Sequence, residues 1–306
     1  MKVSTDIIEG ITVLIAENEH LKCLIVPALG GKLLSVYNKP LQKEFLWTNQ
    51  HLKLAVNEPG AEYDPNFLGG IDELIPNDIP ENVDGIDYPD HGELWTTPLH
   101  YTIEDKKIIL SGKLKLSELF YKKTIQLNDD KPTIHLEYYI KNESSSVKNF
   151  LWKLHAALQI EKDDMLVTSA TKAKVVDPAY SRFSDSNEFT WPMIEDTDAS
   201  IVPSKNDTMD FFFLYDTPVA EIKMLSNNKE HVFSYAYDKA IFPFQWYFAS
   251  FGGFLDHYTA ILEPCTAMPL SVNDAKALGQ CTVLQPGETL ETTVHIFAGL
   301  NQNTTL

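Results

Sequence analysis

Arginine is almost missing from this 306-residue chain, since Arg182 is the only one among 25 lysine and arginine residues. Arginine is the side chain that most often holds phosphate or carboxylate groups through two parallel hydrogen bonds. Its scarcity therefore argues against a site built around an arginine clamp on a sugar phosphate or a uronate. Lysines such as Lys32 and Lys153 remain as cations that a binding site could use.

Positive charge is also scarce overall, because 25 basic residues stand against 43 aspartates and glutamates, a formal net charge of −18. Binding to nucleic acid depends on basic side chains that displace counterions from phosphates. Acidic membrane surfaces attract basic segments for the same electrostatic reason. We therefore expect neither a nucleic acid nor a membrane as a partner, and the sequence leaves the oligomeric state open.

Cysteines and long apolar runs are few as well. The three cysteines are widely spaced, which supports neither a disulfide framework nor a cysteine-zinc site. No apolar stretch approaches the length of about 18 residues expected of a membrane-spanning helix. Asp6 and Glu9 interrupt the region where a signal peptide needs an apolar core. These features predict a reduced, cytoplasmic protein.

Several common catalytic motifs do not occur. The chain has no phosphate-binding Walker loop, no GxGxxG fingerprint, no HExxH zinc motif and no GxSxG nucleophile elbow. Two histidines at metal-chelating spacing, HxH or HxxxH, are also lacking, so a metal centre is the weaker interpretation. Acidic loops could hold Ca²⁺, but no ligand spacing demands it. We expect no cofactor and no bound metal.

The chain is instead rich in short β-branched runs that alternate apolar and polar residues. Ile11–Ala16 and Leu21–Pro27 predict an opening hairpin, and similar runs continue to Glu291–Leu300. Short helical turns are expected only near Leu41–Trp47 and Val272–Leu278. About twenty strands without alternating helices predict an all-β fold, with two large antiparallel sheets stacked in one domain over residues 1–306.

Asn57–Pro98 is the irregular part of the chain and is rich in proline, glycine, asparagine and aspartate. A segment of that length without regular structure is usually functional or disordered. It carries His91, Trp95 and several carboxylates, so we favour a functional role. Gly92 would let its backbone approach another segment closely.

Two histidines and a few carboxylates stand out as candidates for acid–base chemistry. Histidine titrates near neutral pH, and a partly buried glutamate can have a raised pKa. Glu263 ends an apolar run, where a buried carboxylate is costly unless it is paired. His155 lies in the apolar run FLWKLHAAL, where a hydrogen-bonded core histidine is the commoner explanation. Trp95 and Trp246 are by default core aromatics, although either could stack on a sugar ring.

Four segments, in their order and spacing, resemble the aldose 1-epimerase or galactose mutarotase-like family, as a divergent branch. They are GGIDELIP at Gly69–Pro76, DHGELW at Asp90–Trp95, the run around His155, and ILEPCTAMP followed by LQPGETLE within Ile261–Glu291. The opening LIVPALGGKLLSVYNK is also similar to that family's first strands. The resemblance spans nearly the whole chain and implies a β-supersandwich of two large antiparallel sheets.

The resemblance implies an isomerase that interconverts the α and β anomers of a free sugar. By motif, Glu263 matches the family's base, His155 its acid, and His91 the histidine that binds the sugar near the ring oxygen. Asp72, Glu73 and Trp95 would contact hydroxyls or stack on the ring. Trp246 is a weaker candidate for stacking. The expected partner is a small sugar molecule.

The sequence also departs from the family, because the arginine expected near the first histidine is missing. Lys32 or Lys153 is the candidate to replace it, and the absence argues against the branch that acts on hexose 6-phosphates. A carbohydrate-binding protein without catalytic activity is the alternative on the same fold. A glycosidase would need Glu263 to pair with Asp72 or Glu73 across the scissile bond. A uronate lyase would need more cationic groups.

Overall fold

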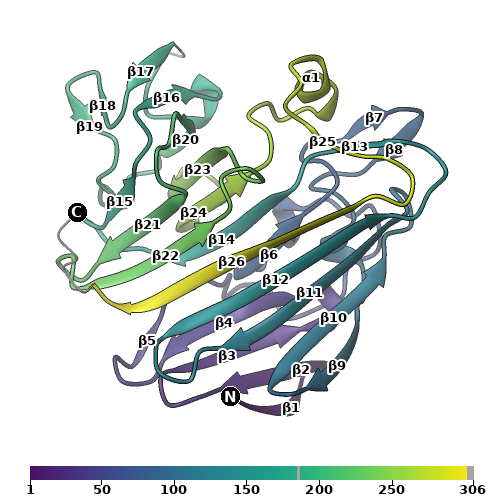
Figure 1. Cartoon of the computed structure of the whole chain (residues 1–306). Coiled ribbons are helices and arrows are strands. Elements are labelled where there is room, and N and C mark those ends of the chain that lie inside the picture. The colour runs from purple at the N-terminus through teal and green to yellow at the C-terminus, as the bar shows by residue number, and fades with distance from the viewer. Residues whose placement is uncertain (185–186, 302–306) are drawn as a thin grey trace.

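Two antiparallel sheets dominate the computed structural model, which describes residues 1–184 and 187–301 (Figure 1). The larger sheet has the spatial order β1 (Lys2–Ile8), β2 (Ile11–Glu17), β3 (Leu21–Val26), β4 (Lys32–Asn38), β6 (Ile71–Leu74), β14 (Lys153–Gln159), β24 (Tyr258–Cys265), β23 (Phe244–Phe251), β20 (Met209–Tyr215), β16 (Lys172–Val175) and β17 (Glu188–Thr190), with β5 (Lys43–Glu44) beside β4. The smaller sheet has the order β15 (Met165–Thr168), β21 (Glu221–Ser226), β22 (His231–Tyr237), β26 (Thr289–Leu300), β12 (Thr133–Asn142), β11 (Leu119–Leu127), β10 (Lys107–Lys113) and β9 (His100–Glu104).

Short elements complete the described part of the chain. The two-stranded ribbons are β7 (Glu81–Val83) with β8 (Ile86–Tyr88), β13 (Lys148–Phe150) with β25 (Thr282–Leu284), and β18 (Met193–Ile194) with β19 (Thr197–Asp198). The helices are α1 (Val272–Ala277) and the 3₁₀ turns η1 (Pro27–Leu29), η2 (Asp64–Asn66), η3 (Leu94–Thr96) and η4 (Pro178–Tyr180). Within the described ranges, no helix has both the length and the apolarity that crossing a bilayer requires.

Pleating divides the side chains of the larger sheet between two faces, because successive residues of a strand point in opposite directions. Leu154 of β14 and Leu262 of β24 belong to one buried apolar cluster that also contains Leu136 and Ile296 of the smaller sheet. This cluster is the core between the sheets. The alternate residues of β14 and β24, among them His155 and Glu263, therefore face the outer side of the larger sheet.

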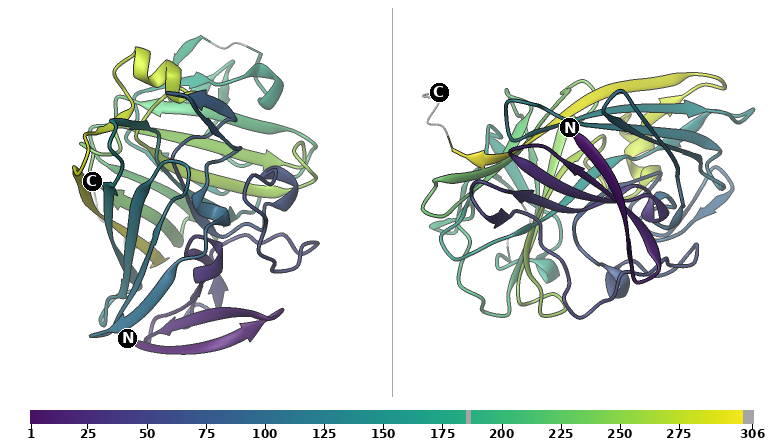
Figure 2. Two further views of the ribbon diagram at one scale, coloured as in Figure 1. Left: turned by 90° about the vertical axis from the view of Figure 1, so that its right-hand side faces the viewer. Right: turned by 90° about the horizontal axis from the view of Figure 1, so that it is seen from below.

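The all-β prediction is confirmed, and the predicted turn at Val272–Leu278 is helix α1. The expectation of a helical turn at Leu41–Trp47 is wrong. The carboxylate of Glu44 accepts hydrogen bonds from the backbone N–H groups of Val36 and Leu46, and β5 pairs with β4. Backbone hydrogen bonds also join Trp47 to Ala157 and Phe45 to Gln159 of β14. These contacts hold the segment extended in place of a helix. The hairpin of β1 and β2 projects at the end of the molecule remote from α1 (Figure 2).

Candidate active site

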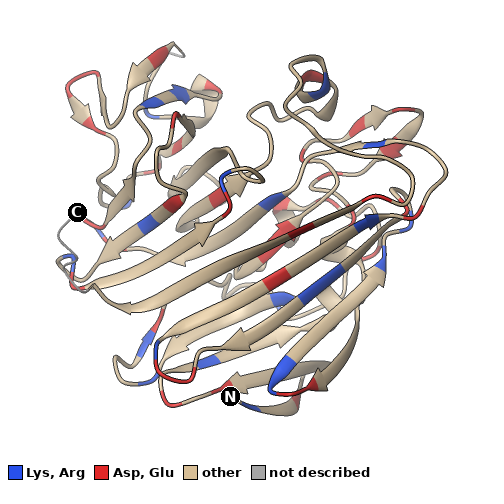
Figure 3. Ribbon diagram, in the orientation of Figure 1, with Lys and Arg blue, Asp and Glu red and all other residues tan. Residues whose placement is uncertain are grey.

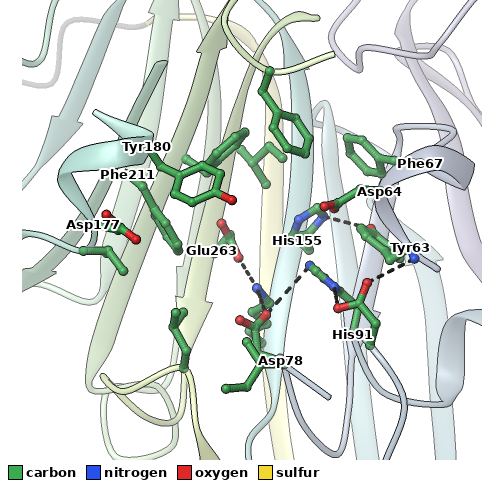
Figure 4. A pocket seen from close by; sticks show the side chains of 18 of the residues that line it. Tyr63, Asp64, Phe67, Asp78, His91, His155, Asp177, Tyr180, Phe211 and Glu263 are labelled. Atoms are coloured by element: carbon green, nitrogen blue, oxygen red, sulfur yellow. Dashed lines mark hydrogen bonds and ion pairs between the residues drawn. The ribbon is translucent and has the colours of Figure 1, made fainter. Parts of the chain in front are cut away.

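A cavity of about 290 Å³ lies on the outer face of the larger sheet, over β14 and β24 (Figure 4). Its floor includes Lys153 and His155 of β14 and Glu263 of β24. Segment 57–98, which the sequence predicts to be irregular but which contains strands β6, β7 and β8, forms one wall. The other lining residues come from later parts of the chain and are mostly apolar: Val176, Asp177, Tyr180, Phe211, Phe248, Phe254, His257, Thr259, Ile261 and Leu270.

His155 and Glu263 lie at facing positions on neighbouring strands. The ladder between β14 and β24 pairs Ala156 with Leu262 and Lys153 with Cys265, so the same register sets His155 opposite Glu263. Facing residues on antiparallel strands have their Cβ atoms roughly 4.5–5.5 Å apart. Both side chains turn toward the same space in Figure 4. A small ligand above this floor can therefore touch the carboxylate and the imidazole together.

A buried lysine joins two carboxylates beneath the cavity. The Lys153 Nζ atom lies 2.5 Å from Asp78 Oδ1 and 2.7 Å from Glu263 Oε2, and the lysine side chain is 3% exposed. Its ammonium also lies 4.5 Å from the centre of the Trp246 ring, within cation–π range. Burial opposes the charged form of Lys153, but the carboxylates of Asp78 and Glu263 raise its pKa above the usual value. The two carboxylates therefore favour the charged form of Lys153.

Burial shifts the pKa of the candidate base and of the candidate acid in opposite directions. It raises the pKa of Glu263 above the usual value, although the charge of Lys153 opposes that shift. It lowers the pKa of His155 well below the usual value, and the nearby positive charge of Lys153 adds to the effect. Opposed shifts of this kind are typical of paired acid–base groups in enzymes.

Tyr63 connects His155 to a second buried ion pair. Its hydroxyl donates to Asp72 Oδ2 at 2.8 Å, and Asp72 also pairs with Lys32 Nζ at 2.5 Å. His155 Nδ1 lies 3.4 Å from the same hydroxyl. Because the Tyr63 hydroxyl donates its proton to Asp72, the hydroxyl oxygen can only accept a hydrogen bond from His155 Nδ1. We therefore assign the proton of neutral His155 to Nδ1, which leaves Nε2 as the nitrogen that exchanges a proton with a ligand.

His91 is held between carboxylates and an aromatic ring. Its Nδ1 atom lies 2.8 Å from Asp90 Oδ1, and its Nε2 atom lies 3.9 Å from Asp78 Oδ1. The imidazole stacks on Tyr63 with ring centres 4.1 Å apart and planes 10° from parallel. These contacts fix the orientation of His91 at the edge of the cavity.

Acidic groups outnumber cations around this cavity. Asp64, Asp78, Asp90, Asp177 and Glu263 line it, whereas Lys153 is the one lysine or arginine among its described lining residues. Among all the residues that the structure describes, the cavity lining included, His, Cys, Asp and Glu side chains do not form any group of three or more that could hold a metal ion. The donor set of the cavity therefore suits proton transfer and hydrogen bonding to hydroxyl groups.

No protein-family model matches the sequence, and no curated protein matches it significantly. Solved structures do match it over nearly the whole chain. A galactose mutarotase-like protein from Clostridium acetobutylicum aligns with a TM-score of 0.73 and 15% identity, covering 98% of this chain and 99% of that one. A proposed aldose 1-epimerase from Escherichia coli K12 aligns with a TM-score of 0.72 and 12% identity, covering 95% and 100%. The chain has the galactose mutarotase-like fold.

A third match, a galactose mutarotase-like protein from Lactobacillus casei, has a TM-score of 0.66 and 17% identity and covers 94% of this chain and 100% of that one. The galactose mutarotase-like resemblance predicted from the sequence motifs is therefore confirmed at the level of the fold. Identities of this size carry no information on substrate or catalytic residues, so those rest on the geometry of the cavity.

The galactose mutarotase-like fold brings together three of the predicted site residues. His91, His155 and Glu263 all line the cavity, although they come from a loop and two strands that are far apart in the sequence. Their chemical roles stay predictions.

Asp72, Trp95 and Trp246 do not line the cavity but lie behind it. Asp72 contacts Tyr63 and Lys32 in a neighbouring hollow, where Trp95 packs edge-on against Tyr63 at 5.1 Å. Trp246 is fully buried beneath Lys153. Their positions suit support of the lining residues better than the predicted contact with a sugar.

Glu73 points to the opposite side of the sheet. Its two carboxylate oxygens lie 2.7 and 2.8 Å from Lys123 Nζ, and it accepts a third bond from the Tyr138 hydroxyl. Asp72 and Glu73 are neighbours in β6, so pleating sends their side chains to different faces. Glu73 therefore cannot reach a ligand in the cavity, and the predicted sugar contact is not supported.

Sequence reasoning missed several residues that shape the cavity. Tyr63 and Asp78 come from the irregular segment but belong to no recognised motif. The aromatic wall of Phe211 and Phe248 belongs to β20 and β23, where alternation predicts a strand but not which face meets a ligand. Of the two lysines considered as replacements for arginine, Lys153 lines the cavity and Lys32 does not.

Gly92 makes a tight contact that positions His91. It has a φ of +75°, and a Cβ atom there would lie 2.2 Å from the backbone oxygen of Ile75. Gly85, in the β7–β8 turn, also has a positive φ, of +87°, but open space around it. We expect Gly85→Ala to cost about 1–2 kcal/mol through the left-handed conformation alone. Gly92→Ala should cost a further 1–3 kcal/mol, roughly, because of overpacking.

Urea unfolding of the two variants measures this difference. A larger loss of unfolding free energy in Gly92→Ala is the expected result. Equal losses in Gly92→Ala and Gly85→Ala would mean that the contact between Gly92 and Ile75 contributes nothing.

Proposed function

We propose that this protein is an isomerase of the aldose 1-epimerase type, which interconverts the α and β anomers of a neutral free sugar. The observation that carries the proposal is the facing arrangement of Glu263 and His155 on the floor of one cavity. A carboxylate and an imidazole at this spacing can reach the anomeric hydroxyl and the ring oxygen of one sugar at once. The fold, shared with proteins named for this activity, adds support.

In the proposed reaction, Glu263 removes the proton from the anomeric hydroxyl. The electrons of the broken O–H bond form a C1 carbonyl, and the bond between C1 and the ring oxygen breaks. Protonated His155 gives a proton to the ring oxygen as it leaves, so the sugar opens to the free aldehyde. Rotation about the C1–C2 bond and the reverse proton transfers then close the ring as the other anomer.

His91 is proposed to bind the sugar beside the ring oxygen. Asp90 fixes one of its nitrogens, and stacking on Tyr63 fixes its plane. The aromatic side chains Phe211, Phe248 and Tyr180 offer flat apolar faces for the sugar ring.

A neutral sugar fits the charges of the cavity better than an anionic one. The single lining lysine, Lys153, is already paired with two carboxylates. The only arginine, Arg182, is bound to Asp210 through contacts of 2.6–3.2 Å. Phosphorylated or carboxylated sugars would meet uncompensated carboxylates, so we expect weak binding of both.

Exchange spectroscopy by NMR on a panel of neutral aldoses tests the proposal. We expect the wild-type protein to accelerate exchange between the two anomeric signals of at least one sugar above the buffer blank. Ligand-induced shifts without acceleration would support the alternative, a carbohydrate-binding protein. Acceleration only with phosphorylated sugars would contradict the proposed substrate class.

The pH dependence of kcat/KM is a further prediction. The base Glu263 must be ionised, and burial raises its pKa above 4.5, so the rate should fall as the pH drops through that raised value. The acid His155 must be protonated, and burial lowers its pKa below 6.5, so the rate should fall as the pH rises through that lowered value. Because the two shifts bring the two declines toward each other, we expect a narrow bell without a plateau. A plateau that extends to pH 8 would contradict this assignment of acid and base.

A further inference from the structure

Lys153 occupies a position that the proton-transfer steps do not use. It lies on β14 two residues before His155, on the same face of the strand, and its side chain is almost completely buried. Its ammonium contacts Asp78 Oδ1 and Glu263 Oε2 and rests over the ring of Trp246. A buried lysine is retained at such a cost only where its partners compensate it.

Two carboxylates share this one ammonium, so the group of three carries a net charge of −1. In a buried setting the charge of each member acts strongly on the other two. Two charged groups, Lys153 on β14 and Asp78 in the loop after β6, have the largest charge effects on Glu263. The other titratable groups around it are His155, His91, Tyr63 and Cys265. On the other side, β23 presents the uncharged ring of Trp246 opposite Glu263. Lys153 and Asp78 therefore supply the positive and the negative charge that act most strongly on Glu263.

We propose that Lys153 and Asp78 are a pair of positioning residues that act through Glu263. Lys153 holds the Glu263 carboxylate ionised and directed into the cavity. Asp78 pairs with the same ammonium and so weakens the effect of Lys153 on Glu263. The Glu263 carboxylate can therefore still accept a proton. This inference rests on the proposed role of Glu263 as the base.

The directions of the charge effects on Glu263 support the proposal. Burial raises the pKa of Glu263, the charge of Lys153 lowers it, and the charge of Asp78 raises it. A change at Lys153 and a change at Asp78 should therefore move the ionisation of Glu263 in opposite directions. A change at a residue with only a structural role would leave the ionisation of Glu263 where it is.

The test is the pH at which kcat/KM declines on the acidic side, measured by NMR anomer exchange. We expect Lys153→Met to move this decline upward by roughly 1–3 pH units, since Glu263 loses its cation. We expect Asp78→Asn to move it downward by up to about one unit, since a competing negative charge is lost. In Lys153→Arg, which keeps the positive charge, the acidic decline should lie close to its wild-type pH.

Lys123→Met is the matched control, because Lys123 is an equally buried lysine paired with a glutamate outside the cavity. In Lys123→Met, the acidic decline of kcat/KM should stay at the wild-type pH. If Lys153→Met does not fold, Asp78→Asn still decides the question. An unchanged position in Asp78→Asn, or a shift in the same direction as in Lys153→Met, would overturn the proposal.

A second readout does not depend on activity. In protein labelled with ¹³C at the glutamate carboxyl, the Glu263 signal is identified by its loss in Glu263→Gln, and its titration is followed directly. Opposite shifts in Lys153→Met and Asp78→Asn would support the inference even if no sugar is isomerised. In that case the proposed function fails and the electrostatic role of the pair stands.

Discussion

Replacing Glu263 by glutamine is expected to reduce the rate of anomer exchange by roughly 10²–10⁴-fold, the range typical of a lost general base. Glutamine keeps the size of the side chain and its place on β24 but cannot take up a proton. The side chain is 2% exposed, so a base from bulk solvent cannot easily take its place. The loss should therefore appear in kcat rather than in sugar affinity.

The measurement is NMR anomer exchange on the sugar that responds best, together with chemical-shift titration of binding. Glu137→Gln is a suitable control, because Glu137 is exposed on β12 of the smaller sheet. Its rate should equal that of the wild-type protein. Full activity in Glu263→Gln would remove Glu263 from the mechanism, whereas loss of binding together with rate would indicate a wider structural defect.

The second large effect concerns stability and is expected at the ion pair between the sheets. Lys123→Met should lower the free energy of unfolding by about 3–5 kcal/mol, because it leaves the Glu73 carboxylate buried without its cation. Lys123 is fully buried and contacts both Glu73 oxygens, while Tyr138 donates a further hydrogen bond. Figure 3 shows that charged residues lie within strands β6 and β11 as well as in loops.

Urea unfolding checks this prediction against an exposed ion pair. Lys107 pairs with Glu137 at 3.0 Å, with side chains 35% and 54% exposed, and Lys107→Met should cost less than about 1 kcal/mol. The double variant Lys123→Met with Glu73→Leu should recover most of the loss, since it removes the unpaired charge. Similar losses at Lys123 and Lys107 would show that burial adds nothing to this pair.

The architecture was predictable because its signal is local. Alternation in runs such as Ile11–Ala16 and Leu21–Pro27 predicts strands, and the structure has β2 and β3 there. The prediction for Leu41–Trp47 failed because its conformation depends on distant partners. The Trp47 N–H donates to the Ala157 oxygen, and the Gln159 N–H donates to the Phe45 oxygen. Local sequence carries little information about partners that only tertiary structure supplies.

The candidate site was predictable only where a motif marked it. His91, His155 and Glu263 belong to such motifs, and all three reach the cavity. Asp72 and Glu73 lie in a motif too, but adjacent residues of one strand cannot share a face. Once β6 was placed as a strand, at most one of the two could have faced the cavity.

The partners of the candidate base were the hardest part to foresee. Asp78 and Lys153 are 75 positions apart in the chain, and no spacing rule joins them. Their contact arises because the loop after β6 returns over β14. Sequence alone suggests a cation for the cavity without saying which carboxylates surround it.

The ladder between β14 and β24 has a consequence for how such a protein diversifies. Backbone hydrogen bonds fix the spacing of His155 and Glu263, whereas Tyr63, Tyr180 and their neighbours stand on connecting segments. Substitutions in those segments would reshape the space for a ligand while the proposed proton-transfer pair keeps its register. Differences in ligand preference would therefore arise in the loops while the spacing of His155 and Glu263 stays the same.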